Sequence, residues 1–316
     1  MNSSLHPAEA QFAIGVDVGG TKCLGVVWSE GKIVAEVRRP TPDQSPEGPG
    51  GVVAVIAEVV ADLETQLGVS PKGLGIPVGV GMPGLVTRSG IVRASPNLTG
   101  VADLAVRDLL EARLERQVWV DNDATCAAIA EWRTGAGEGL QDMVMVTLGT
   151  GIGGGIIANG TVVRGAHGFA GEIGHMVLDP EGPQCPCGQR GCWERFASGS
   201  ALESRADQVF GPGKVRGADL ARLASQGDEQ AQEIFREFAH WVALGLANLT
   251  NIFDPSVIVI GGGVTRTAPL FFKTVQDNFV ALLYAPHLRP QPKIVVASLD
   301  ERAGAVGAAL LAGLRP

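Results

Sequence analysis

Two distant segments of the chain repeat one pattern, in which an apolar strand runs into a turn of glycine and threonine and a second apolar strand returns. The pattern occurs at Val16–Thr21 and again at Val146–Gly151. Each copy begins a β-meander and is followed by alternating strands and helices, which is typical of α/β proteins. We therefore expect a duplicated α/β fold of two lobes with a central cleft between them.

The spacing of apolar residues and turn residues predicts where the individual strands and helices lie. Strands are expected, in chain order, at 12–18, 23–28, 33–39, 76–81, 85–94 (a hairpin), 118–121, 143–148, 154–158, 257–260 and 293–298. Helices are expected at 52–67, 104–116, 124–133, 228–253 and 303–314.

Length, charge and cysteine content exclude several classes of protein. A chain of 316 residues is long enough for two domains, and its net charge of −8 argues against nucleic acid or an anionic membrane as a partner. Glycine, proline or charge interrupts the apolar runs before they could span a membrane, and residues 1–11 lack the pattern of a secretory signal. The odd number of cysteines, 5, suits a reducing compartment, so we expect a cytoplasmic protein.

Three glycine-rich turns follow apolar strands and could bind phosphate. Glycine lets backbone N–H groups approach an anion closely, and threonine, lysine and aspartate beside the turns could add donors and hold Mg²⁺. The spacing is neither that of a Walker A loop nor that of a Rossmann fingerprint, and tight hairpin turns also need glycine. Three such turns together predict a split nucleotide site. Its candidate residues are Asp17, Gly19, Gly20, Thr21, Lys22, Gly149, Thr150, Gly151, Gly153, Gly154, Gly261, Gly262 and Gly263.

The segment Asp121-Asn122-Asp123 lies where a predicted strand ends and a helix begins. Carboxylates at the carboxyl end of a strand in an α/β fold lie where ligands bind, so Asp123 is a candidate general base and Asn122 a candidate partner of a substrate hydroxyl. Asp and Asn are also preferred N-cap residues, and one of the three suits that role.

A histidine and three cysteines predict a metal site. His175 precedes Cys185, Cys187 and Cys192, and three thiolates with one imidazole are the ligand set of a closed structural Zn²⁺ site. A closed site leaves no position for a metal-bound water, so the zinc would be structural. The carboxylates of Glu172 and Glu194 flank this cluster and suit a polyhydroxylated ligand, although a single glutamate is more often simply exposed.

Taken together, these motifs resemble the ROK family of repressors, open reading frames and sugar kinases. The resemblance spans almost the whole chain and follows the order of the family's motifs. The matching segments are Asp17–Lys22, Gly81–Gly84, Pro96–Leu98, Asp121–Asp123, Leu148–Gly155, Gly171–His175, Cys185–Glu194 and Ile260–Gly263.

The resemblance implies an actin-like, ribonuclease H-like ATPase fold and an ATP-dependent sugar kinase that phosphorylates the 6-hydroxyl of a hexose, above all glucose. It implies lobes at 1–122, completed by the helix 302–316, and at 123–301. It makes Asp123 the general base and implies ATP, Mg²⁺ and structural Zn²⁺ as cofactors and a homodimer as the assembly. The sugar-binding residues that it implies are Gly81, Asn97, Asn122, Asp123, Glu172, His175 and Glu194.

Several alternatives stay open at this point. Mannose, fructose, N-acetylglucosamine or N-acetylmannosamine could replace glucose, particularly because Val101 stands where many members have an aromatic residue. Polyphosphate could replace ATP. A sugar-sensing repressor would need a DNA-binding module, for which only residues 1–11 precede the first strand, and a zinc-stapled binding module would not need Asp123.

Overall fold

The computed structural model describes residues 12–42, 50–68, 75–95, 98 and 100–313. The chain divides into two units, one of Met1–Ala130 with Arg302–Pro316 and the other of Glu131–Glu301. The family resemblance implied a boundary between residues 122 and 123. In the structure it lies at 130/131, inside helix α3 (Asp123–Thr134), and the C-terminal helix groups with the first unit.

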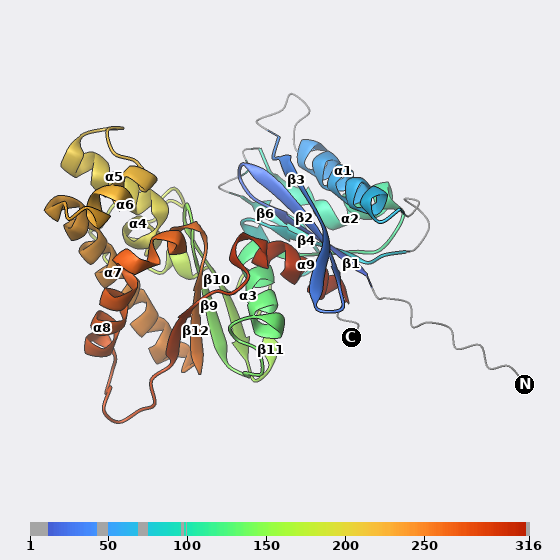
Figure 1. The fold of residues 1–316 in the computed structure, drawn as a ribbon. Coiled ribbons are helices and arrows are strands. Elements are labelled where there is room, and N and C mark those ends of the chain that lie inside the picture. Colours follow the sequence, from blue (N-terminus) through green and yellow to red (C-terminus); the bar gives the residue numbers. More distant parts are fainter. Residues whose placement is uncertain (1–11, 43–49, 69–74, 96–97, 99, 314–316) are drawn as a thin grey trace, which may run out of the picture. The chain divides into compact units, whose positions relative to one another are not determined.

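The first unit contains a sheet with the strand order β3-β2-β1-β4-β8 (Figure 1). Its strands are β1 Ala13–Val18, β2 Lys22–Ser29, β3 Lys32–Pro40, β4 Val78–Met82 and β8 Val118–Asn122. The first three form an antiparallel meander, whereas β4 and β8 run parallel to β1. The carboxyl ends of β1, β4 and β8 therefore lie at one edge of the sheet, which is where ligands bind in open α/β sheets.

Helices cover both faces of this sheet. A Cβ atom at Gly25 of β2 would contact Val59 of helix α1 (Gly50–Gln66), whereas Cβ atoms at Gly15 and Gly79 would meet helix α9 (Ala303–Gly313). The latter two atoms would lie 1.9 and 1.8 Å from backbone oxygens of α9, so only glycine lets this helix lie directly on the strands. The short apolar sequence of α9 is buried almost throughout, as expected of a helix that is apolar all round.

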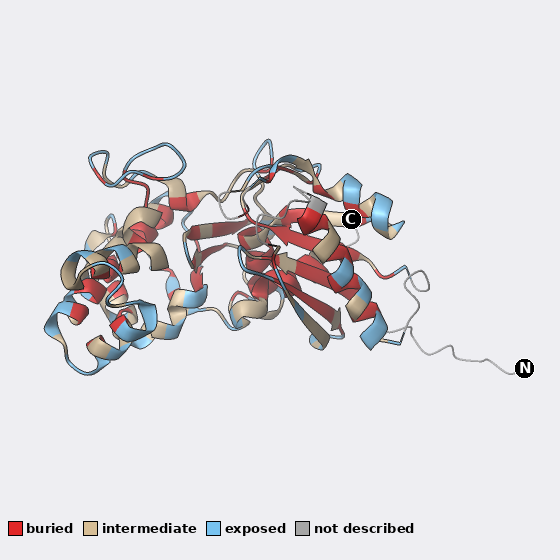
Figure 2. Ribbon diagram, turned by 90° about the horizontal axis from the view of Figure 1, so that it is seen from above, coloured by how far each residue is buried: buried red, intermediate tan, exposed pale blue. Residues whose placement is uncertain are grey.

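The second unit repeats the arrangement of the first. Its sheet has the order β11-β10-β9-β12-β13, with β9, β10 and β11 antiparallel and β12 and β13 parallel to β9. These strands are β9 Met143–Leu148, β10 Ile152–Ala158, β11 Thr161–Val162, β12 Val257–Gly261 and β13 Lys293–Val296. Matching strand order and direction confirm the predicted duplicated α/β fold. The central strands β1, β4, β9 and β12 are largely buried (Figure 2), whereas the edge strands are more exposed.

The helices of the second unit surround the long helix α7 (Glu229–Phe253), which packs against its neighbours along most of its length. Asp228 caps α7 by accepting a hydrogen bond from the N–H group of Ala231, at 2.9 Å. The other helices are α4 Glu194–Ala197, α5 Gly199–Phe210, α6 Gly217–Ser225 and α8 Phe272–Leu282. In the described part of the chain no helix combines the length and the apolar character that crossing a bilayer requires.

Most predicted elements are present, but one helix start was wrong. The sequence predicted a helix from residue 104, whereas residues 102–105 form strand β7 and helix α2 spans Val106–Leu114. Leu104 and Ala105 pair with Val92 and Ile91 of β6 (Ile91–Ala94), which also pairs with β5 (Leu85–Val86). Cross-strand pairing thus outweighed the helical preference of leucine and alanine.

Candidate functional site

The glycine turn between β1 and β2 is exposed and is fixed at its base. The N–H group of Gly19 donates to the backbone oxygen of Lys22 at 2.8 Å, and the hydroxyl of Thr41 donates to the backbone oxygen of Gly19 at 2.7 Å. Gly20, Thr21 and Lys22 are exposed. The turn can therefore present backbone N–H groups and a cation to a ligand without rearrangement of its anchor.

Positive φ angles do not explain the glycines of these turns. Of the described glycines at 19–20, 149–155 and 261–263, Gly262 alone has a positive φ, of 86°. Gly149 and Gly263 lack a positive φ, and a Cβ atom added to either would have no atom within 4 Å. The tight-turn explanation is therefore wrong for most of them. An open approach for a ligand fits Gly149 and Gly263, whereas Cβ atoms at Gly151, Gly154 and Gly261 would lie between 2.5 and 2.6 Å from neighbouring side chains.

Two carboxylates flank Gly81 at the ends of β1 and β8. A Cβ atom at Gly81 would lie 3.4 Å from the Oδ1 atom of Asp17 and 3.4 Å from the Cα atom of Asp123. Burial, followed by repulsion from Asp123, raises the pKa of Asp17 from its usual 3.8 to about 8, although Lys22 opposes the shift. A divalent cation on Asp17 would offset both causes, so the donor set fits Mg²⁺.

The helix cap at this point is Asn122, not Asp123. The Oδ1 atom of Asn122 accepts a hydrogen bond from the N–H group of Thr125 at 3.0 Å, and its amide donates to the backbone oxygen of Gly84 at 3.1 Å. Asp121 is buried, and its carboxylate accepts the N–H group of Asn122 at 2.9 Å. Capping and burial thus account for Asn122 and Asp121, while the Oδ1 atom of Asp123 accepts the N–H group of Ala124 at 2.8 Å.

The structure adds Gly304, which sequence reasoning missed. A Cβ atom at Gly304 would lie between 2.5 and 2.7 Å from the three carboxyl atoms of Asp17. The first turn of α9 therefore rests on this carboxylate, where the positive end of the helix dipole favours a negative charge. No local pattern marks Gly304, because it lies within a run of small residues at the opposite end of the chain from Asp17.

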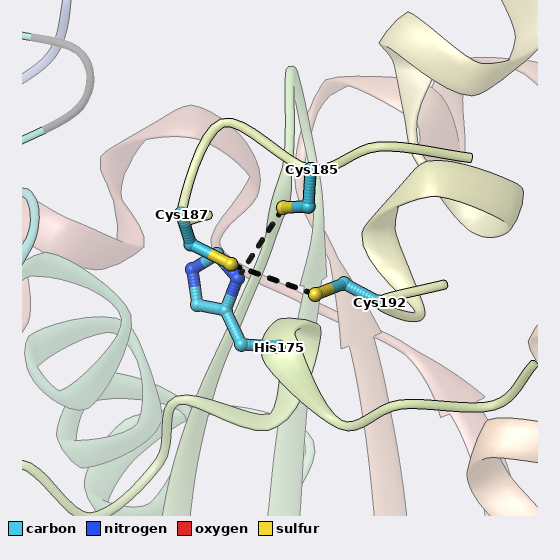
Figure 3. Close-up of side chains that lie close together, drawn as sticks. All are labelled: His175, Cys185, Cys187 and Cys192. Carbon is cyan, nitrogen blue, oxygen red and sulfur yellow. Dashed lines mark hydrogen bonds between the residues drawn. The ribbon is translucent and has the colours of Figure 1, made fainter. Parts of the chain in front are cut away.

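In the second unit the predicted metal ligands converge (Figure 3). His175 comes from a short 3₁₀ helix, Ile173–His175, and the three cysteines come from one loop. Their ligand atoms all lie within 4.8 Å of one another, with 3.6 Å between the Sγ atoms of Cys187 and Cys192 and 3.8 Å from Sγ of Cys185 to Nδ1 of His175. A tetrahedron with Zn–S bonds of about 2.3 Å has edges of about 3.8 Å, so the cluster fits Zn²⁺.

The backbone of the loop and the chemistry of its thiols also suit a cation. Gly188 and Gly191 have positive φ angles of 95° and 67°, and a Cβ atom at Gly191 would lie 1.5 Å from the backbone oxygen of Asp179. Burial is the largest cause that raises the pKa of the Cys185 thiol, and a bound cation would reverse this effect. The cysteines, all within the described residues, form no disulfide.

The two glutamates predicted to bind a sugar flank the metal cluster. Oε1 of Glu194 accepts the thiol of Cys185 at 3.2 Å, and His175 lies 3.9 Å from carboxylate oxygens of both Glu172 and Glu194. Burial and the charge of Glu194 raise the pKa of Glu172, while His175 lowers it. A Cβ atom at Gly151 would lie 2.5 Å from Oε2 of Glu194, so this carboxylate also borders the second glycine turn.

Comparison with known proteins identifies the family. A model of the ROK family matches residues 13–314. The chain belongs to the ROK family. A glucokinase of Streptomyces coelicolor is 36% identical over 95% of the chain and 97% of its own length. A glucokinase of Thermotoga maritima is 35% identical over 94% and 95%, respectively.

Solved structures give the same result for this ROK protein. A ROK family glucokinase from Streptomyces griseus, solved in complex with glucose and AMPPNP, is 36% identical with a TM-score of 0.83 over 96% of this chain and 99% of that chain. A ROK hexokinase from Thermus thermophilus is 38% identical with the same TM-score over 96% and 98%. The likeness confirms the predicted actin-like fold.

The predicted site residues of the ROK protein fall into two groups, one in each unit. The first unit brings together Asp17, Gly81, Asn122, Asp123 and the turn of Gly19, Gly20, Thr21 and Lys22. The second unit brings together Glu172, His175, Glu194, Cys185, Cys187, Cys192 and the turn that contains Gly149, Thr150, Gly151, Gly153 and Gly154. Gly261, Gly262 and Gly263 end β12, beside β9. Asn97 lies outside the described residues.

Proposed function

We propose that this ROK protein is an ATP-dependent sugar kinase that transfers the γ-phosphoryl group to the 6-hydroxyl of a hexose, and that glucose is its substrate. The observation that carries the proposal is the pair of carboxylates, Asp17 and Asp123, on either side of Gly81 at the carboxyl ends of neighbouring strands. The glucokinases that resemble the chain over nearly their full length support glucose over the other sugars considered.

Asp123 is the general base of the proposed reaction. Its carboxylate takes the proton of the sugar 6-hydroxyl while that oxygen bonds to the γ-phosphorus and the bond from phosphorus to the bridging oxygen of ADP breaks. Burial, and after it repulsion from Asp123, raises the pKa of Asp17 and favours a proton on it in the metal-free protein. Mg²⁺ on Asp17 would displace that proton and leave Asp123 ionised beside the substrate.

The three glycine turns hold the nucleotide phosphates in this proposal. Glycine lets an anion approach the backbone of these turns closely, and Lys22 and the hydroxyls of Thr21 and Thr150 supply further donors. Mg²⁺ would be held by Asp17 and would neutralise charge on the transferring phosphate. This arrangement needs no basic surface, which agrees with the net charge of −8.

Glu172, His175 and Glu194 bind the sugar hydroxyls in this proposal. Carboxylates accept hydrogen bonds from hydroxyl groups, and the thiol cluster fixes His175 and Glu194 relative to one another. We infer that Zn²⁺ binds His175 and the three cysteines and has a structural role, because the four side chains fill a tetrahedral shell. The homodimer and the cytoplasmic location stay predictions.

A coupled assay of ADP formation tests the proposal. Purified protein with ATP and Mg²⁺ is given glucose, mannose, fructose, N-acetylglucosamine or N-acetylmannosamine. With polyphosphate in place of ATP, formation of the sugar phosphate is measured instead, because no ADP is released. We expect turnover with glucose and ATP, with the highest kcat/KM among the sugars. Turnover that is faster with another sugar would correct the substrate, and no turnover with any sugar would refute the kinase.

A further inference from the structure

A pocket in the second unit lies outside the residues assigned to the kinase reaction. It has a volume of about 290 Å³, close to the lower limit for small-molecule pockets. Helices α4, α5 and α7 form its walls, and Pro183, from the loop that carries the cysteines, borders it. All these elements belong to one unit, so the pocket exists without any contribution from the other.

Arg195 gives the pocket an uncompensated positive charge. Its Nε atom is buried and, within the described part of the chain, has no hydrogen-bond partner. The other arginine of the pocket, Arg205, is paired with Glu237 through two hydrogen bonds of 2.6 and 2.9 Å. A buried donor without an acceptor is destabilising, so Arg195 favours an occupant that supplies an acceptor.

Aromatic and aliphatic side chains form most of the remaining wall of the pocket, together with Ser204 and Gln208. The rings of Phe196 and Trp241 stack at 4.1 Å with an angle of 21° between their planes. Leu202, Ile234 and Phe238, also part of the lining, are buried. A cation beside a stacked aromatic wall is complementary to a ligand that has an anionic group on a flat apolar body.

We propose that this pocket is a second ligand site, which takes a small organic carboxylate with a flat apolar body. The carboxylate accepts hydrogen bonds from the guanidinium of Arg195, and the body of the ligand lies in the apolar part of the pocket, beside Phe196 and Trp241. The Arg205–Glu237 pair is already satisfied and leaves the charge of the pocket at one positive unit, which matches a monoanion.

The position of α4 links this pocket to the proposed sugar-binding residues. Arg195 and Phe196 directly follow Glu194, and the indole N–H group of Trp193 donates to the backbone oxygen of Trp241 at 2.8 Å. Trp193 is held against α7 so closely that a Cβ atom at Gly245 would lie 2.0 Å from its ring. An occupant of the pocket therefore contacts the short helix that carries Glu194. If Glu194 binds glucose, as the proposed function has it, binding in the pocket changes the KM for glucose.

Binding of benzoate, compared with its neutral isostere benzamide, tests the site without reference to catalysis. Isothermal titration should give a measurable Kd for benzoate and one at least about tenfold weaker for benzamide, because only benzoate forms charge-assisted hydrogen bonds. Equal affinities, or no binding of benzoate at about 20 mM, would overturn the proposal.

Three variants identify the pocket as the place where benzoate binds. Arg195→Gln should weaken benzoate binding by at least about tenfold, and Ser204→Trp, which adds an indole at an exposed residue of the lining, should abolish binding. The control Arg222→Gln removes an exposed arginine of α6, paired with Asp219, and should leave the Kd unchanged. Wild-type affinity in both pocket variants would refute the site. Benzoate binding that leaves the KM for glucose unchanged would refute the link to Glu194 but not the site.

Discussion

The carboxylate of Glu131 is the best place to test whether the stability of this fold depends on buried charge. Glu131 is fully buried in α3, at the first position of the second unit. Its Oε1 atom accepts the N–H groups of Ser298 and Leu299 at 2.9 and 2.8 Å, and its Oε2 atom accepts the N–H group of Ala136 at 2.8 Å. It thereby ties α3 to the segment that leads the chain back to the first unit at Arg302.

Replacing this carboxylate by an amide should cost several kilocalories per mole. A hydrogen bond to a charged group contributes about 1.5–3 kcal/mol and a neutral one about 1 kcal/mol, so the two bonds to Ser298 and Leu299 should weaken by about 2 kcal/mol together. The amide nitrogen of Gln would face the N–H group of Ala136, which loses its acceptor at a cost of about 1–3 kcal/mol. We expect Glu131→Gln to lower the free energy of unfolding by about 3–5 kcal/mol.

Calorimetry and hydrogen exchange measure this loss separately. At about 2–4 °C per kcal/mol, the unfolding transition should fall by about 10 °C. The amides of Ala136, Ser298 and Leu299 should exchange faster with solvent than in the wild type, because their acceptor is lost or weakened. Glu138→Gln, a change at an exposed glutamate just after α3, is the matched control and should alter neither readout.

Two results would refute the reasoning on Glu131. If the free energy of unfolding stays within about 1 kcal/mol of the wild type, the free energy of desolvating the carboxylate offsets the stabilisation from its hydrogen bonds. Unchanged exchange at Ser298 and Leu299 would mean that these amides do not depend on Glu131. An equal loss in Glu138→Gln would assign the effect to α3 in general.

Three further outcomes are expected. Asp123→Asn should abolish phosphoryl transfer while calorimetry still detects glucose binding, and retained turnover would remove Asp123 from the role of base. Because the pKa of Asp17 is raised to about 8, the metal-free folded state favours its protonated form and should lose stability as the pH rises from about 4 to about 8. In Asp17→Asn, the free energy of unfolding should fall less between pH 5 and pH 8.5 than in the wild type, as measured by urea titrations without Mg²⁺. An equal fall in both proteins would contradict the assigned pKa. Cys187→Ala should lose zinc, as measured by elemental analysis, and weaken glucose binding, whereas full glucose affinity in zinc-free wild type would argue against a structural zinc.

Local patterns in the sequence were enough to predict most strands and the position of the glycine turns. Alternating apolar residues and glycine turns define β1, β2, β9 and β10, because each strand pairs with its neighbour in the chain. The convergence of His175 with the three cysteines was also predictable, because the cysteines lie within one short loop. Strand β7 was missed because its residues, Ala102–Ala105, have no strand preference of their own and extend only through pairing with β6.

Contacts between distant parts of the chain left no trace in the sequence. Gly304 approaches Asp17, and Glu131 binds the amides of residues 298 and 299, across separations that no periodic pattern spans. Likewise, the sequence does not show that the Nε atom of Arg195 is buried without a hydrogen-bond partner, because this depends on how α4, α5 and α7 pack together. In each case the functional group is a common residue, and its environment alone makes it unusual.

The glycines of this chain divide according to what a side chain would meet. At Gly79 an added Cβ atom would lie 1.8 Å from the backbone of α9, so alanine at this position would destabilise the fold itself. At Gly149 and Gly263 the same atom would meet nothing within 4 Å, and neither residue has a positive φ. Packing and backbone conformation therefore leave these two positions free to carry a side chain. Alanine at Gly149 or Gly263 should therefore weaken the binding of a ligand that approaches the turn, as the proposed phosphate site requires, and leave the fold unaffected.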